Sequence, residues 1–170
     1  ATDAPYRPVP TGRSADGLNR ETWDIQGRPG PKNPGRTRVG SQSAQSGHAE
    51  TTEATRTVVD VQARLSHMDE LGVDIQVLYP TIFLGVISDI PAVELALTKS
   101  YNRWLGDIYA RSGGRLRWVA IPPLGEMNAV PEELEAAKEN GACGVFMRGF
   151  EGERLVTDPF FASLYEAAES

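Results

Sequence analysis

Residues 73–80 read VDIQVLYP, and the stretches RLRWVAIPPL at 115–124 and GACGVFMRG at 141–149 repeat its arrangement, a short apolar run that follows a segment of helical periodicity. Alternating helical and strand patterns predict a parallel sheet whose strands are joined by right-handed helical crossovers. In such sheets, ligand sites lie at the carboxyl ends of the strands. The predicted strands cover residues 73–79, 116–121 and 143–147.

Four helices are predicted around these strands. The first three end at glycines, which commonly stop helices, and prolines mark the first turn of the last three. The predicted helices cover residues 57–71, 89–112, 128–140 and 159–170. The sequence therefore predicts an α/β fold built from parallel βαβ units.

The composition is that of one ordinary globular domain, with 170 residues, of which 40% are hydrophobic and 24% charged. A net charge of -6 provides no basic field for phosphates, so nucleic acid is not an expected partner. No apolar run approaches the roughly 20 residues of a membrane helix, and no basic region followed by an apolar core opens the sequence. We therefore expect a cytoplasmic protein without a membrane partner.

Residues 1–56 differ from the rest, because they are rich in glycine, proline, serine and threonine and contain few apolar anchors. They predict an irregular arm or insertion loop, either a binding lid or a disordered segment, beside a domain at 57–170. Trp23 and Ile25 predict one short strand within this arm, in a hairpin wing.

Four stretches together resemble a known family. They are MDELGVDIQVLYPT at 68–81, YNRWLGDIYARSGGRLRWVAIPPL at 101–124, GACGVFMRG at 141–149 and DPFFASLYEAAE at 158–169. In order and spacing they are similar to the amidohydrolase-related family that includes aminocarboxymuconate-semialdehyde decarboxylase and related aromatic-acid decarboxylases. The resemblance covers residues 57–170 well and 17–56 loosely, as the family's variable insertion.

The resemblance implies a TIM-like (β/α)₈ barrel of which this chain supplies strands two to four. It also implies a divalent metal, zinc first, with manganese or iron as alternatives. The family binds this metal through a His-x-His pair, two further histidines and an aspartate, and this sequence contains no His-x-His. Because such a barrel needs about 250 residues, we expect the metal ligands to lie outside this chain. The implied reaction is hydrolysis or decarboxylation of a small carboxylate-bearing, possibly aromatic, substrate.

Three residues are candidates for substrate binding. Arg148 directly follows an apolar strand, where its guanidinium can bind a carboxylate through two parallel hydrogen bonds. The alternative for Arg148 is a salt bridge to Glu151 or Glu153 that organises the loop. Tyr79 and Thr81 flank the end of the first strand and can donate hydrogen bonds, although Tyr79 can equally pack against the next strand.

Other reactive side chains have structural interpretations. Cys143 is expected to be a buried apolar filler in its strand, and His67 and His48 are expected to be a helix-surface and a loop residue without metal-ligand spacing. Asp69 and Asp74 precede a strand, at the amino-terminal face of the sheet, where residues stabilise this fold rather than catalyse. No catalytic nucleophile or base is identified.

Two further hypotheses remain open. In one, the chain is a non-catalytic barrel subunit that associates with a partner chain carrying the metal site, and in the other it is an incomplete part of a longer chain. An open three-stranded sheet leaves unpaired edges and uncovered apolar faces, so we expect an oligomer rather than a compact monomer. The apolar face of the last helix, around Phe161, is expected to be the docking surface.

Overall fold

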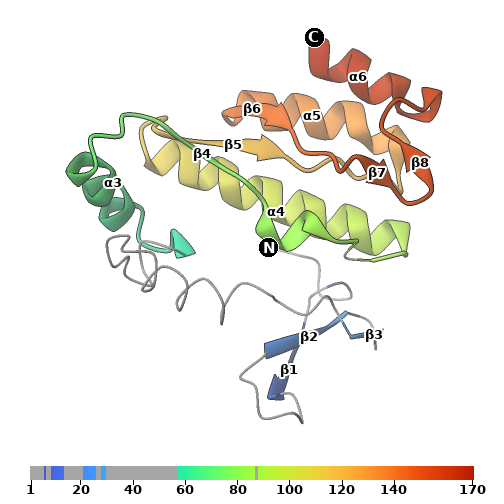
Figure 1. The fold of residues 1–170 in the computed structure, drawn as a ribbon, viewed down its shortest axis with the longest axis horizontal. Helices are drawn as coiled ribbons and strands as arrows, with labels where there is room; N and C mark the ends of the chain where they lie inside the picture. The colour runs from blue at the N-terminus through green and yellow to red at the C-terminus, as the bar shows by residue number, and fades with distance from the viewer. Residues whose placement is uncertain (1–5, 7–8, 14–20, 26–27, 30–56, 87) are drawn as a thin grey trace.

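The computed structural model describes residues 6, 9–13, 21–25, 28–29, 57–86 and 88–170. Its principal feature is a three-stranded parallel sheet in the order β4-β5-β6, with helices between the strands (Figure 1). The strands are β4 (Gln76–Leu78), β5 (Leu116–Ala120) and β6 (Ala142–Val145). The predicted α/β class and its parallel βαβ units are confirmed.

The two outer strands are shorter than the sequence predicts. Gln76 lies opposite Leu116 and Leu78 opposite Trp118, so β4 is bounded by its pairing with β5. On the other side, Ala120 lies opposite Val145. Of the three strands, β5 alone has a neighbour on both sides, and its observed range agrees best with the predicted one. Just beyond β6, the Phe146 N–H still donates to the Ala120 carbonyl at 2.8 Å, so contact with β5 continues one residue past the end of the strand.

The four predicted helices are present. They are α3 (Val61–Glu70), α4 (Pro91–Arg111), α5 (Val130–Glu139) and α6 (Ala162–Glu169), with 3₁₀ turns η2 (Thr81–Leu84), η3 (Met127–Ala129) and η4 (Pro159–Phe161). The first helix begins later than predicted because the Asp60 carboxylate caps it, accepting a hydrogen bond from the Ala63 N–H at 3.0 Å. No helix in the described ranges is both long and apolar enough to cross a membrane.

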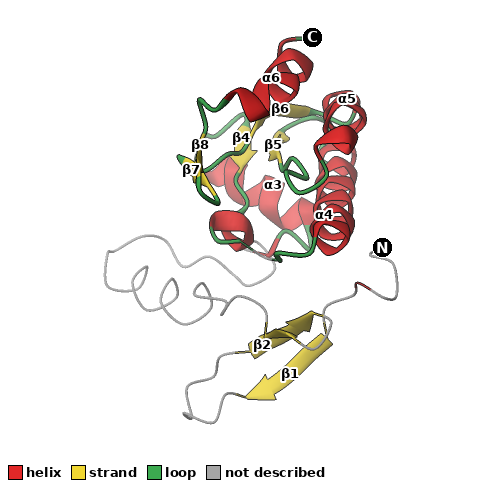
Figure 2. Ribbon diagram, turned by 90° about the vertical axis from the view of Figure 1, so that its right-hand side faces the viewer, coloured by secondary structure: helices red, strands yellow, loops and turns green. Residues whose placement is uncertain are grey.

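The core lies between β5 and the helices that flank it. Leu116, Trp118 and Ala120 alternate along β5 and are almost fully buried, and Figure 2 shows α4 and α5 side by side along this side of the sheet. The Trp118 indole N–H donates to the backbone carbonyl of Asn140 at 3.0 Å, which joins β5 to the end of α5. Burial of so large a ring makes Trp118 the centre of the core.

The opposite side of β4 is not covered within the described chain. Ile75, Val77 and Tyr79 alternate along it and are 56%, 40% and 65% exposed. Tyr79, for which hydrogen bonding at the site and packing against the next strand were both open, is therefore largely exposed. The expectation that Cys143 is buried is wrong, because β6 is an edge strand and the Cys143 side chain is exposed.

Two polar side chains, Asn102 and Arg115, fix the ends of β5. At its carboxyl end, the buried side-chain amide of Asn102 bonds both the N–H and the carbonyl of Ile121. At its amino end, Arg115 pairs with Asp69 at 2.7 Å and donates to the carbonyls of Val73 and Asp74. Asp69 thus forms an ion pair at this face, and its expected stabilising role stays a prediction.

The last helix packs within the chain. Phe161 and Leu164 are each only 1% exposed, and α6 lies against α5. The expectation that Phe161 docks a partner is wrong, because its own chain already covers it. Phe160 and Tyr165, by contrast, are partly exposed.

In the amino-terminal part, the short strand predicted around Trp23 and Ile25 is confirmed as β2 (Glu21–Ile25). It pairs antiparallel with β1 (Val9–Arg13) and β3 (Arg28–Pro29). His48 and the rest of residues 30–56, part of the predicted arm, lie outside the described residues.

Candidate functional site

The carboxyl ends of the strands form one edge of the sheet, and four segments meet there. They are the loop after β5, the residues after β6, the small hairpin β7 (Phe150–Glu151) and β8 (Arg154–Leu155), and the first turn of α4 (Figure 1). The crossovers bring these segments together, because a helix that follows a parallel strand begins at the edge where that strand ends. We call this edge the rim.

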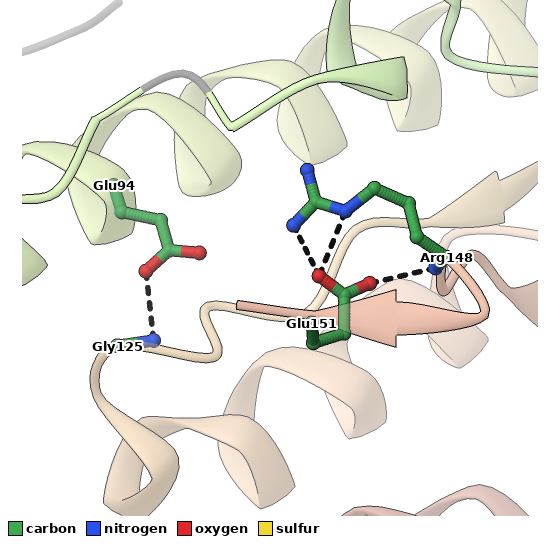
Figure 3. Close-up of polar contacts among 4 residues, drawn as sticks. All are labelled: Glu94, Gly125, Arg148 and Glu151. Atoms are coloured by element: carbon green, nitrogen blue, oxygen red, sulfur yellow. Dashed lines mark hydrogen bonds and ion pairs between the residues drawn. The ribbon is translucent and has the colours of Figure 1, made fainter. Parts of the chain in front are cut away.

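Arg148 lies on the rim and is held by Glu151. The guanidinium Nε donates to Glu151 Oε2 at 2.8 Å, and Nη2 contacts the same oxygen (Figure 3). The backbone N–H of Arg148 donates to Oε1 of the same carboxylate at 2.6 Å. Of the two partners considered for a salt bridge in the sequence analysis, Glu151 is therefore the one that pairs with Arg148. This salt bridge joins the end of β6 to the β7–β8 hairpin.

A second carboxyl group, that of Glu94, reaches the rim from α4. Its Oε2 accepts a hydrogen bond from the backbone N–H of Gly125 at 2.7 Å, which ties α4 to the loop after β5 (Figure 3). Burial raises the pKa of Glu94, and the nearby Glu151 charge acts in the same direction. The Gly125 hydrogen bond and the Arg148 charge lower this pKa but do not offset the burial.

Glu94 and Gly125 were not predicted as site residues. A signal for Glu94 does exist in the sequence. Pro91 marks the first turn of a helix that follows a strand, which places Glu94 at the rim. No comparable signal marks Gly125, because its role is carried by a backbone N–H.

Two hollows adjoin these groups and share the side chains of Glu94, Arg148 and Glu151. The smaller, of about 30 Å³, is lined by apolar residues that include Phe83 and Phe146. The larger, of about 280 Å³, lies close to the lower end of the roughly 300–1,000 Å³ typical of small-molecule sites. A group of charged side chains beside an apolar wall is the arrangement that fixes the orientation of a small ligand.

The larger hollow extends to Arg154 and Phe160. The Arg154 guanidinium carbon lies 4.4 Å from the centre of the Phe160 ring, and Arg154 Nη1 lies 3.4 Å from the Asp158 carboxylate. These contacts hold Arg154 over an aromatic surface. The hollow therefore combines two guanidinium groups with apolar area from Phe160.

Tyr79, the second predicted binding residue, follows β4 but does not line either hollow beside Arg148. Thr81 begins η2, and its side chain lies outside the described part of the chain. Their roles in substrate binding, like that of Arg148, stay predictions.

The residues that the structure describes include no group of three or more His, Cys, Asp or Glu side chains arranged to hold a metal ion. His67 lies in the last turn of α3 and is half-buried. The described residues do not fit the divalent metal site that the resemblance implies.

No protein-family model and no curated protein sequence matches the chain.

Proposed function

We propose that the chain forms strands two to four of a TIM-like (β/α)₈ barrel of the amidohydrolase-related kind. The assembled barrel acts as a hydrolase or decarboxylase on a small carboxylate-bearing, possibly aromatic, substrate. Arg148 binds the substrate carboxylate in this proposal. The divalent metal, zinc or else manganese or iron, would be held by another part of the barrel, and we assign no step to it.

One observation carries the proposal. A partly exposed guanidinium, that of Arg148, stands at the carboxyl end of a parallel strand and borders a hollow of small-molecule size. This is the edge at which parallel α/β sheets bind ligands. Glu151 fixes the orientation of the guanidinium through Nε and Nη2, so it acts as a positioning residue, and Nη1 remains to meet a ligand (Figure 3).

Native mass spectrometry with elemental analysis of the protein from its native source tests the assembly and the metal. We expect a mass well above the 18.5 kDa of this chain, with stoichiometric zinc, manganese or iron. A species of 18.5 kDa or its simple multiples, free of metal, would contradict the enzyme proposal.

Replacing Arg148 tests the carboxylate role in the same material. Arg148→Ala is expected to raise KM or lower kcat/KM for a carboxylate substrate while bound metal is unchanged. Arg111→Ala, at an exposed α4 arginine, is the control and should leave both unchanged. Loss of metal in the Arg148 variant would show that Arg148 has been misplaced.

A non-catalytic barrel subunit is the second candidate function. The observation that favours it is the uncovered apolar side of β4, with Ile75, Val77 and Tyr79, since exposed apolar area of this kind marks an association surface. In that case Arg148 and Glu151 organise the rim without binding a substrate. An assembled species that contains metal but shows unchanged kinetics in Arg148→Ala would favour this function.

A further inference from the structure

The two carboxyl oxygens of Glu94 have different surroundings. Oε2 accepts from Gly125, whereas the other oxygen points away from Gly125 toward the side on which Arg148 lies (Figure 3). Both residues line the larger hollow. A ligand group between them would therefore meet a guanidinium and a carboxyl at the same time.

The charges around this space determine which ligand it accepts. Glu151 already neutralises Arg148, and Asp158 lies beside Arg154. The other charged side chains lining the hollow with Glu94 are those of Asp89, Arg148, Glu151 and Arg154. If Glu94 were ionised, its negative charge would face the space beside Arg148, and like charges would oppose the binding of an incoming carboxylate there. With a proton on Glu94, the same group donates a hydrogen bond.

We propose that the larger hollow binds small aromatic monocarboxylates between Arg148 and the protonated carboxyl of Glu94, so that binding is coupled to the uptake of one proton. This inference rests on the proposed carboxylate role of Arg148 and adds a second ligand-binding residue. The ligand carboxylate takes one hydrogen bond from Arg148 and one from Glu94. Phe160, which lines the same hollow, provides the apolar contact for the ring.

Burial raises the pKa of Glu94 in the free protein, which favours the protonated form that the proposal requires. A bound carboxylate would raise the pKa of Glu94 further, since it places a second negative charge beside it. Above the pKa of Glu94 in the free protein, binding must therefore supply a proton from solvent. Affinity falls as the pH rises through that region, with a slope approaching about tenfold per pH unit.

Isothermal titration calorimetry with benzoate measures this coupling in the full chain. Titrations at one pH in two buffers of different ionisation enthalpy give the number of protons taken up. We expect uptake approaching one proton per benzoate in the wild-type protein and weaker binding of benzamide, the neutral analogue of the same shape. Benzamide binding as tight as benzoate would overturn the carboxylate role of Arg148.

Glu94→Gln is the decisive variant. The glutamine oxygen can keep the Gly125 hydrogen bond, and its amide replaces the donor without titrating. This variant should bind benzoate without proton uptake and with little dependence on pH. Glu135→Gln, at an exposed glutamate of α5, is the matched control and should retain the wild-type uptake. Thermal unfolding of each variant establishes that the comparison is between folded proteins.

The outcomes separate this inference from the proposed function. Benzoate binding without proton uptake in the wild-type protein, or with the same uptake in Glu94→Gln, would overturn the role of Glu94 and leave that of Arg148 standing. No benzoate binding by the wild-type protein across the pH range would overturn both. Binding that persists unchanged in Arg148→Ala would overturn the proposed site itself.

Discussion

The side-chain amide of Asn102 forms two hydrogen bonds with the backbone of Ile121, one to its carbonyl and one from its N–H, both 3.0 Å long. These bonds replace a strand partner just beyond the end of β5, where the backbone turns into the Pro122–Pro123 loop. The middle of α4 is thereby attached to the point at which the rim begins.

Asn102→Ala should consequently destabilise the fold. It leaves the N–H and carbonyl of Ile121 without their buried partner, and each unsatisfied group costs about 1–3 kcal/mol. We expect the free energy of unfolding to fall by about 2–4 kcal/mol in urea denaturation. Asn140→Ala is the control, since Asn140 is exposed and its side chain bonds only the local Ala136 carbonyl. Equal losses in the two variants would contradict the role of Asn102.

Gly141 separates α5 from β6 in a conformation that other residues disfavour. Its φ is +85°, and an added Cβ would overlap the ring of Tyr109. Gly141→Ala should lower the free energy of unfolding by about 2–4 kcal/mol, through left-handed strain and overpacking together. Gly72→Ala isolates the strain, because Gly72 has φ +67° but open space around it, and should cost about 1–2 kcal/mol. A loss in Gly141→Ala no larger than in Gly72→Ala would show that Tyr109 moves away freely.

Because of Tyr101, we expect the free energy of unfolding to fall in alkaline solution. Burial raises the pKa of Tyr101 to about 12, above the ordinary value of 10.0. The unfolded chain therefore releases the phenolic proton first, and stability falls as the pH rises from about 10 toward 12. Urea denaturation between pH 9 and 11 should show a decline on the order of 1 kcal/mol that is smaller in Tyr101→Phe. Parallel curves for the two proteins would show that other groups cause the decline.

Arg115 is expected to contribute more to stability than a typical surface arginine. It pairs with Asp69 and donates to two backbone carbonyls, so Arg115→Ala should cost about 1–2 kcal/mol. Arg111 forms only an exposed pair with Asp107, and Arg111→Ala should cost about 0.5 kcal/mol or less. Thermal unfolding at low and high salt checks the difference. The effect of Arg115→Ala should persist at high salt, because bonds to carbonyls are not screened as an ion pair is.

The elements that the sequence predicts well are those whose pattern is local. The helix at Pro91–Arg111 is predicted from local signals, since Pro91 lies in its first turn and Gly113 and Gly114 follow its end. The outer strands were predicted too long, because residues such as Val73 favour extended backbone whether or not a partner strand lies alongside, and the Val73 N–H bonds the Met68 carbonyl of α3 instead of a strand. Burial is less predictable still. The apolar pattern around Phe161 indicates a packing face but does not indicate which surface covers it.

The candidate site shows the same limit. Arg148 was identified because it directly follows an apolar strand, and its salt bridge to Glu151 lies within three residues. Glu94 and Gly125 are 31 positions apart, and their contact depends on how α4 and the loop after β5 meet in space. An acidic residue in a first helical turn ordinarily indicates favourable interaction with the helix dipole. Only the three-dimensional arrangement shows it facing a guanidinium.

The fluorescence of the buried Trp118 can report on the core of the protein. The Trp118 ring is fully buried and its indole N–H donates to the Asn140 carbonyl, so its fluorescence should have a short emission maximum and should not be quenched by acrylamide. Trp104 is 41% exposed, so acrylamide should quench its fluorescence. In a variant that carries both Trp23→Phe and Trp104→Phe, Trp118 is the remaining tryptophan of the sequence, and its emission would report how β5, α5 and β6 come together as the chain folds. The indole that fills the core thereby distinguishes opening of the interior from changes at the helix surface.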